Sequence, residues 1–196
     1  DNFGQVTETR FDSIGPTIGS ELKQQSILAL VLVLLAIMVY IAFVFRKMVV
    51  GLPPLVLGLA AIVALAHDIL IPVGIFAFLG KYYGIEISAV FVAAALTILG
   101  YSISDTVVVF DRVRENVLKS SSYNFGELLH KSIKQTLTRS INTTLTTLLS
   151  LIAIYIFGGD SVKYFALALI IGITLGSYSS IFVASPLIFW YSKRFK

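Results

Sequence analysis

The sequence contains no cysteine and few charged residues. Only 13% of its 196 residues are Asp, Glu, Lys or Arg, whereas 57% are hydrophobic, and the mean hydropathy is +0.89. Soluble domains carry about a quarter charged residues, and a water-soluble fold of this length cannot bury so much apolar surface. The shortage of charge therefore excludes a soluble enzyme, a nucleic-acid-binding module and a disordered chain. The lack of cysteine excludes disulfides and cysteine-ligated metals.

Enzyme motifs are also absent. The sequence has no H-E-x-x-H zinc helix, no G-x-S-x-G elbow and no Walker A loop. Its two histidines, His67 and His130, are too few and too far apart for a metal cluster. We therefore expect a protein that is not an enzyme and has no cofactor, and whose energy source is an ion gradient rather than a nucleotide.

Five long apolar runs dominate what is present. Crossing a hydrocarbon core of about 30 Å takes roughly 20 helical residues, and each run is about that long or longer. Lipid offers no partner for unpaired backbone groups, and the runs lack the alternation of barrel strands, so only helices fit. We predict an all-α membrane protein with five transmembrane helices near residues 26–46, 52–80, 87–111, 139–157 and 162–191.

The basic residues predict the orientation of the helices. Eleven of the fifteen fall on one side, which the positive-inside rule makes cytoplasmic. The amino end of this chain is then extracytoplasmic and its carboxyl end cytoplasmic, as five crossings require. The eleven are Arg46, Lys47, Arg112, Arg114, Lys119, Lys131, Lys134, Arg139, Lys193, Arg194 and Lys196, and the other four are Arg10, Lys23, Lys81 and Lys163.

Two segments lie outside the apolar runs. We expect residues 1–25 to be the end of a domain folded outside the membrane, and residues 26–196 to be the transmembrane domain. Residues 113–138 contain apolar side chains at helical spacing, and Asn124 and Glu127 resemble a capping box. This segment predicts a cytoplasmic amphipathic helix, either lying on the inner leaflet or packed on loops and solvated.

Asp105 is an acid inside the third run. An ionised side chain near the bilayer centre costs at least about 2.5–3.5 kcal/mol, so it needs a reason. Thr97, Tyr101 and Asp105 are four residues apart and share one helix face. Burial disfavours the charged carboxylate and a nearby cation favours it, so such a site can bind or release a proton. The alternative is a structural hydrogen bond between helices.

Arg139 opens the fourth predicted helix and begins a polar stripe. The stripe indicates a polar neighbour or a wet cavity rather than lipid, and Asp105 is the natural counter-ion of the arginine. Alternatively, the arginine snorkels to the headgroups. The stripe continues through Asn142, Thr143, Thr146, Thr147 and Ser150.

Two further features lie within the apolar runs. His67 and Asp68 sit near the centre of the second run, where no short route leads to either membrane surface. Such a neighbouring pair can be a proton relay or a structural hydrogen-bonding knot. In the fifth run, small residues recur every four positions and predict a face for close helix packing. These are Gly172, Gly176, Ser180 and Ala184.

One string makes a family resemblance specific. Residues 100–116, GYSISDTVVVFDRVREN, resemble the fourth transmembrane segment of the SecF protein-export family. The resemblance continues in order through most of the chain, starting with a junction from a periplasmic domain into a membrane helix. These further strings are SIGPTIGSEL at 13–22, VALAHD at 63–68, LTRSINTTLTTLL at 137–149, IFGGD at 156–160 and YFALALIIGITLGSYSSIFVASPL at 164–187.

The resemblance implies a bundle like that of resistance-nodulation-division transporters, paired with SecD around a pseudo-twofold axis in the cell inner membrane. It implies that proton flow moves periplasmic domains, which promote export of an unfolded polypeptide after the SecYEG channel has begun translocation. By position, Asp105 and Arg139 match family residues tied to proton conduction, and Asp68 matches a family aspartate. The resemblance implies SecD, SecYEG, the translocating polypeptide and membrane lipid as partners, and no nucleic acid.

The chain departs from the family pattern in three respects. The first membrane helix and most of the periplasmic domain are not in it, no SecD sequence is fused to it, and Ser104 replaces the usual asparagine. Two other functions stay open: a small-molecule proton antiporter of the same superfamily, and a passive scaffold in which the polar residues only align helices.

Overall fold

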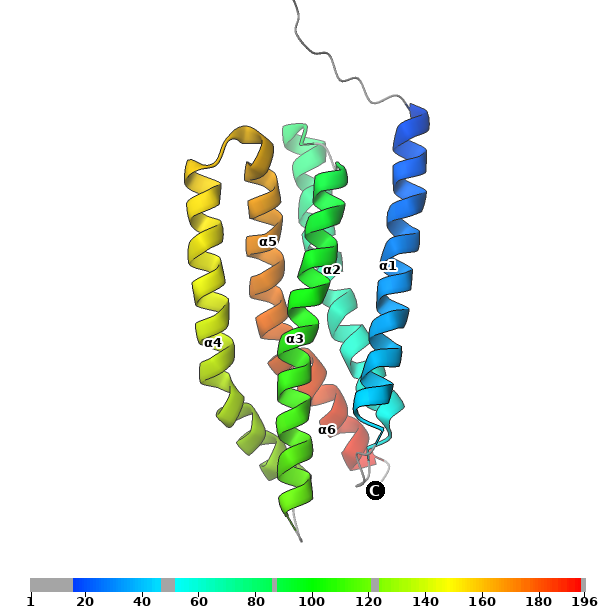
Figure 1. Ribbon diagram of the computed structural model, residues 1–196, viewed down its shortest axis with the longest axis vertical. Coiled ribbons are helices and arrows are strands. Elements are labelled where there is room, and N and C mark those ends of the chain that lie inside the picture. The colour runs from blue at the N-terminus through cyan, green and yellow to red at the C-terminus, as the bar shows by residue number, and fades with distance from the viewer. Residues whose placement is uncertain (1–15, 47–51, 86–87, 121–123, 195–196) are drawn as a thin grey trace, which may run out of the picture.

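The computed structural model describes residues 16–46, 52–85, 88–120 and 124–194, nearly all of them helical. Four long helices run antiparallel, and a last helical rod, made of three consecutive segments over residues 160–194, crosses the bundle (Figure 1). Within the described residues, five helical segments are long and apolar enough to cross a membrane, which confirms the predicted fold class. The elements are α1 (Pro16–Val44), α2 (Pro54–Tyr83), α3 (Ala89–Lys119), α4 (Phe125–Phe157), α5 (Asp160–Ser179), the π-helix η1 (Ser180–Ala184) and α6 (Ser185–Arg194).

Local sequence sets several of the helix ends. Pro53 precedes α2 and Pro54 begins it, where a missing N–H costs nothing. Gly84 ends the same helix in the left-handed conformation, with φ +69°, which glycine adopts without strain. Asn124 caps α4, because its side chain accepts a hydrogen bond from the Gly126 N–H at 3.1 Å.

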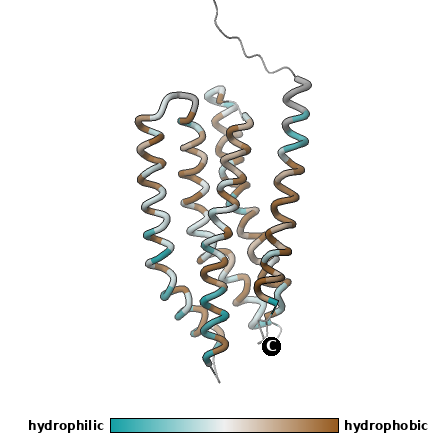
Figure 2. Tube along the Cα trace, in the orientation of Figure 1, coloured by the Kyte–Doolittle hydropathy of each residue, from teal (hydrophilic) through white to brown (hydrophobic). Residues whose placement is uncertain are grey.

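We call the end of the bundle where α3 ends and α4 begins the basic end. Hydrophilic residues gather there along α3 and α4, at the bottom of Figure 2. At this end the helices are longer than the sequence suggested. α3 continues to Lys119 instead of ending near 111, and α4 begins at Phe125 instead of near 139.

The amphipathic segment explains this extra length. Of the segment expected at 113–138, residues 113–119 are the end of α3 and residues 125–138 are the first part of α4, so these residues do not form a separate helix. The apolar side chains Phe125, Leu128 and Leu129 are buried in one cluster with Val113 and Val117 of α3. Because protein and not lipid covers this apolar stripe, both helices continue beyond the apolar runs.

The bundle has two apolar clusters with polar side chains between them. The cluster toward the basic end contains Phe45, Leu57 and Phe110, and the cluster toward the opposite end contains Phe76 and Phe91. In α2, α3 and α4, and at the junction of α5 with η1, buried polar residues lie between these clusters. We call this set the polar layer: Asp68, Ser102, Asp105, Thr106, Ser140, Thr144, Ser179 and Ser180.

α1 stands apart from the other helices over much of its length (Figure 1). Only toward the basic end does it join the core, where Ile41 is fully buried together with Phe45, just past its end. Farther from that end, large apolar side chains such as Leu28, Leu32 and Leu35 are exposed. The polar layer is therefore built by α2 to α5 and not by α1.

Candidate functional site

Asp105 lies on α3 in the polar layer and faces the interior of the bundle. It is 9% exposed. Ser140 of α4 donates a hydrogen bond to its Oδ1 at 3.0 Å, and the hydroxyl of Ser177 on α5 lies beside the carboxyl. Its Oδ2 is buried and has no hydrogen-bond partner among the described residues. A buried carboxylate oxygen without a donor is costly, so this site is incompletely matched to an ionised acid.

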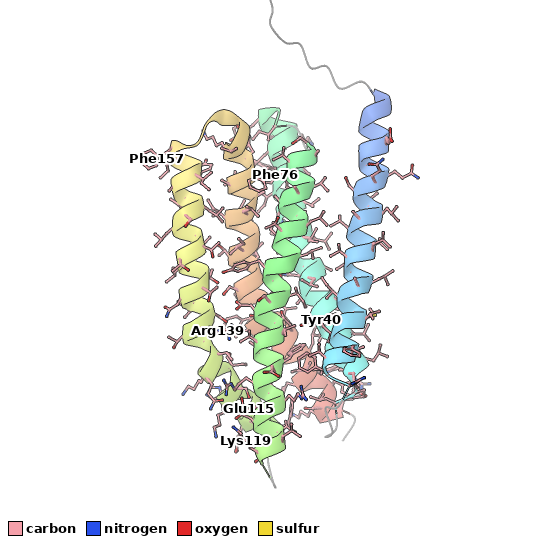
Figure 3. All side chains as sticks on the ribbon, in the orientation of Figure 1. Tyr40, Phe76, Glu115, Lys119, Arg139 and Phe157 are labelled. Carbon is pink, nitrogen blue, oxygen red and sulfur yellow. The ribbon has the colours of Figure 1, made fainter. Side chains whose placement is uncertain are left out.

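Arg139 lies on α4, on the lower part of the helix in Figure 3. It is exposed, and within the described residues no salt bridge joins it to Asp105. The guanidinium is nevertheless close enough for its charge to act on that carboxyl. It lines a pocket of about 240 Å³ with Asp111 and Arg112 of α3 and Gln135 of α4. The structure thus brings the two residues to one region without direct contact.

The predicted polar stripe of α4 is largely exposed, but its hydroxyls are satisfied within the helix. Thr143 donates to the Arg139 carbonyl at 2.8 Å, and Thr147 donates to the Thr143 carbonyl at 2.9 Å. Tyr101 of α3 reaches the Thr147 hydroxyl at 3.5 Å. Such back-bonding lets hydroxyls face an apolar or protein surface without water. The stripe is therefore compatible with a packed partner as well as with a wet cavity.

Asp68 occupies a different part of the polar layer and is fully buried. Its Oδ2 accepts hydrogen bonds from Ser102 of α3 at 2.5 Å and from Ser179 of α5 at 2.6 Å. Its Oδ1 lies 3.0 Å from Nδ1 of His67, whose side chain is 31% exposed. Three helices therefore meet at one carboxyl group, and both of its oxygens have partners.

Close packing of α3 against α5 brings the serines to these carboxyls. A Cβ added to Gly172 would overlap Ile98, and one added to Gly176 would lie 2.9 Å from the Ser102 Cβ. The first two positions of the predicted small-residue face thus give α5 its close approach to α3. The last two, Ser180 and Ala184, bound the π-helix and are also buried.

Four serines contact the two acids without having been expected from the sequence. Ser102, Ser140, Ser177 and Ser179 were not predicted as partners of either carboxyl. One signal was available for Ser140. It belongs to a line of small hydroxyl residues at four-residue intervals on α4, and all four are buried: Ser132, Thr136, Ser140 and Thr144.

The described residues contain no group of three or more His, Cys, Asp or Glu side chains that could hold a metal ion. The two candidate acids sit among serines, and their helices present no phosphate-binding loop. A carboxyl group in a buried, polar setting of this kind can bind and release a proton.

Comparisons with known proteins identify the family. Residues 1–194 match the family described as protein export membrane protein SecD/SecF, C-terminal. The chain belongs to the SecD/SecF family. The SecF translocase subunit of Thermobaculum terrenum is 50% identical over 194 residues, which is 98% of this chain and 60% of that protein. The SecF subunit of Synechocystis sp. is 47% identical and is matched over 94% of this chain and 56% of its own length.

Solved SecDF structures share the fold. The crystal structure of SecDF from Thermus thermophilus superposes with a TM-score of 0.82 at 41% identity, over 92% of this chain and 24% of that one. SecDF in a super-membrane-facing form gives a TM-score of 0.77 at 39% identity, over 93% and 23%. This chain therefore spans about three fifths of these two SecF subunits and about a quarter of the two SecDF chains.

Proposed function

We propose that this chain is the membrane part of a SecF-type subunit that uses the proton gradient, together with SecD, to promote late stages of protein export. Family membership supports the export role, since the matched relatives are named protein translocase subunit SecF. SecD as partner is supported by relatives named SecDF. The SecYEG channel and an unfolded polypeptide in transit complete the proposed assembly.

The proposed location is the cell inner membrane, with the basic end of the bundle in the cytoplasm. α3 ends and α4 begins at that end, and exposed Lys119 and Lys131 lie there with Arg112. The positive-inside rule assigns such an end to the cytoplasm. The amino end of α1 is then extracytoplasmic, where a periplasmic domain would connect to it.

The proton site in this proposal is Asp105. The observation that carries it is the buried Oδ2 of Asp105, which lacks a partner although Oδ1 has one. The hydroxyl of Thr144, one helical turn from Ser140, is also buried and unpaired among the described residues. Unpaired buried polar atoms in a native fold call for an explanation, and a titrating group with nearby water is one.

The charge change at Asp105 is what drives movement in this proposal. When the acid is ionised, Ser140, Ser177 and the field of Arg139 stabilise it. When it is protonated, the new O–H requires an acceptor and the attraction to Arg139 is lost. The two states therefore favour different arrangements of α3, α4 and α5. A membrane potential supplies about 2.3 kcal/mol per charge per 100 mV, which is enough to bias arrangements that differ by a few kcal/mol.

We place SecD against the exposed polar face formed by α3 and α4. Thr97 and Ser104 of α3 and Asn142 and Thr146 of α4 are exposed on these helices. An exposed amide and guanidinium are unfavourable in hydrocarbon, whereas a partner helix can pair with both. Arg139 lies on this face, so a partner there would enclose the proton site.

The test is Asp105→Asn in the complete SecF subunit assembled with SecD. Asparagine keeps the shape of the side chain and removes its titration, so we expect gradient-stimulated export and proton current in proteoliposomes to fall to background. Glu127→Gln is the control, because Glu127 is an exposed acid in the first turn of α4, twelve residues before Arg139 and outside its pocket, and should leave both activities unchanged. Full gradient-stimulated export by the Asp105→Asn complex would refute the proton role.

The same vesicles distinguish the other candidate functions. Proton-coupled efflux of a small hydrophobic dye by the wild-type complex, without stimulated export, would indicate an antiporter. Unchanged export after simultaneous loss of Asp105 and Arg139 would indicate a scaffold.

A further inference from the structure

The second buried acid, Asp68, is bound on both oxygens by groups that can donate hydrogen bonds. Ser102 and Ser179 are 2.5 and 2.6 Å from Oδ2, and His67 Nδ1 is 3.0 Å from Oδ1. Among the described residues, His67 is the only titratable side chain in an ion-pair or hydrogen-bond contact with it. Distances of about 2.5–2.7 Å are typical of O–H donors to an ionised oxygen.

We infer that Asp68 is a permanently ionised anchor that positions the proton site, and does not itself carry protons. Two short contacts on a single oxygen fit an acceptor-only carboxylate. A proton on that oxygen would displace one serine from its donor role. An ionised Asp68 also requires His67 to donate from Nδ1. The charge is then satisfied by three donors, as a buried charge must be.

The anchor acts on Asp105 through α3 and α5, so this part of the inference depends on the proposed function. Ser102 lies three residues before Asp105 on α3, and Ser179 lies two residues after Ser177 on α5. Gly176 brings the α5 backbone against Ser102 between these pairs. By holding Ser102 and Ser179 together, Asp68 fixes the spacing of α3 and α5 at the level where Ser177 meets the Asp105 carboxyl.

The experiment is infrared difference spectroscopy of the complete SecF–SecD complex in lipid nanodiscs, recorded as a function of pH. The carbonyl stretch of a protonated carboxylic acid is distinct from the bands of a carboxylate. We expect Asp68→Asn to keep the number of titrating carbonyl bands of the wild type, with the Asp105 band displaced, and Asp105→Asn to lose one band. Loss of a titrating band in Asp68→Asn would overturn the assignment of a fixed charge.

The positioning role has its own readout, because the frequency of the Asp105 carbonyl band reports its hydrogen bonds. Ser102→Ala and Ser179→Ala should displace this band, as should Ser177→Ala, which removes a hydroxyl beside the carboxyl. Ser180→Ala is the matched control, since Ser180 is equally buried and its hydroxyl donates to the Ser177 carbonyl at 3.0 Å, while no hydrogen bond within the described residues joins that hydroxyl to either carboxyl. Merely loosened packing would affect all of these variants alike.

The outcomes separate the two proposals. An Asp105 band that stays in place in both Ser102→Ala and Ser179→Ala refutes the positioning role. The serine variants also decide this question if Asp68→Asn fails to assemble. The absence of any Asp105 band in the wild type refutes the positioning role together with the proton role, while the Asp68→Asn spectrum still decides whether Asp68 is ionised.

Discussion

Asp68 and Asp105 are the same kind of side chain in the same layer of the bundle, yet their surroundings differ. Each lies beside a serine of α5 and bonds to a serine of a neighbouring helix. Asp68 has a hydrogen-bond partner at both oxygens, whereas Asp105 has a buried oxygen without one among the described residues. On our proposals, the satisfied carboxylate is a structural element, and the one with an unpaired oxygen is the proton site.

The comparison predicts a large difference in stability between two isosteric variants. Asp68→Asn weakens three donor contacts, each worth about 1 kcal/mol in a membrane or slightly more when charge-assisted. We expect it to lower the free energy of unfolding by about 3 kcal/mol, and Asp105→Asn to lower it by about 1 kcal/mol or less. Reversible unfolding in mixed micelles measures both. Equal losses would mean that the two acids are held alike.

A second variant separates α3 from α5, whose close packing positions serines beside both acids. Gly172→Ala places a Cβ against Ile98, and because α3 and α5 then separate, we expect a loss of about 2 kcal/mol. Gly100→Ala is the control on α3, since a Cβ there meets nothing within 4 Å, and alanine favours the helix by up to about 1 kcal/mol. The same unfolding assay compares them. An unchanged Gly172→Ala protein would show that the polar layer does not depend on this close approach.

The smallest change in stability is expected where a buried hydroxyl lacks a hydrogen-bond partner, and it can be compared with a buried hydroxyl that has one. Thr144→Val removes a buried hydroxyl that has no partner among the described residues, so stability should stay the same or rise by up to about 1 kcal/mol. Ser140→Ala removes the donor to Asp105 and should lower stability by about 1 kcal/mol. Destabilisation by Thr144→Val in the unfolding assay would indicate a bound partner for this hydroxyl in the native protein.

Much of the fold could be predicted because membrane insertion depends on local composition. Apolar runs of about 20 residues or more determine the spans, and they predicted five helices, two of which contain Asp68 and Asp105. The helix ends at the basic end could not be predicted in this way. Phe125 and Val117 become part of one core only when α3 and α4 fold against each other, and the sequence does not reveal this packing.

The candidate site was predicted less completely than the fold. Asp105 and Arg139 were expected to face each other, and the structure brings them to one region without a salt bridge. The stripe from Asn142 to Ser150 was expected to meet a polar neighbour or a wet cavity, but Ser140, on another face of the same helix, provides the hydrogen bond to Asp105. Helical periodicity shows which residues share a face, but not which neighbouring helix that face meets.

The sequence by itself determined the number of spans, the basic end and the two acids in the apolar runs, because each depends on residues that are neighbours along the chain. Only the tertiary structure decided which acid is satisfied. The donors to Asp68 lie 34 and 111 residues away from it, and the donor to Asp105 lies 35 residues away. Small residues on α5 allow the approach of α3 that brings such distant serines to the carboxyls, so the difference between the two acids arises from helix packing.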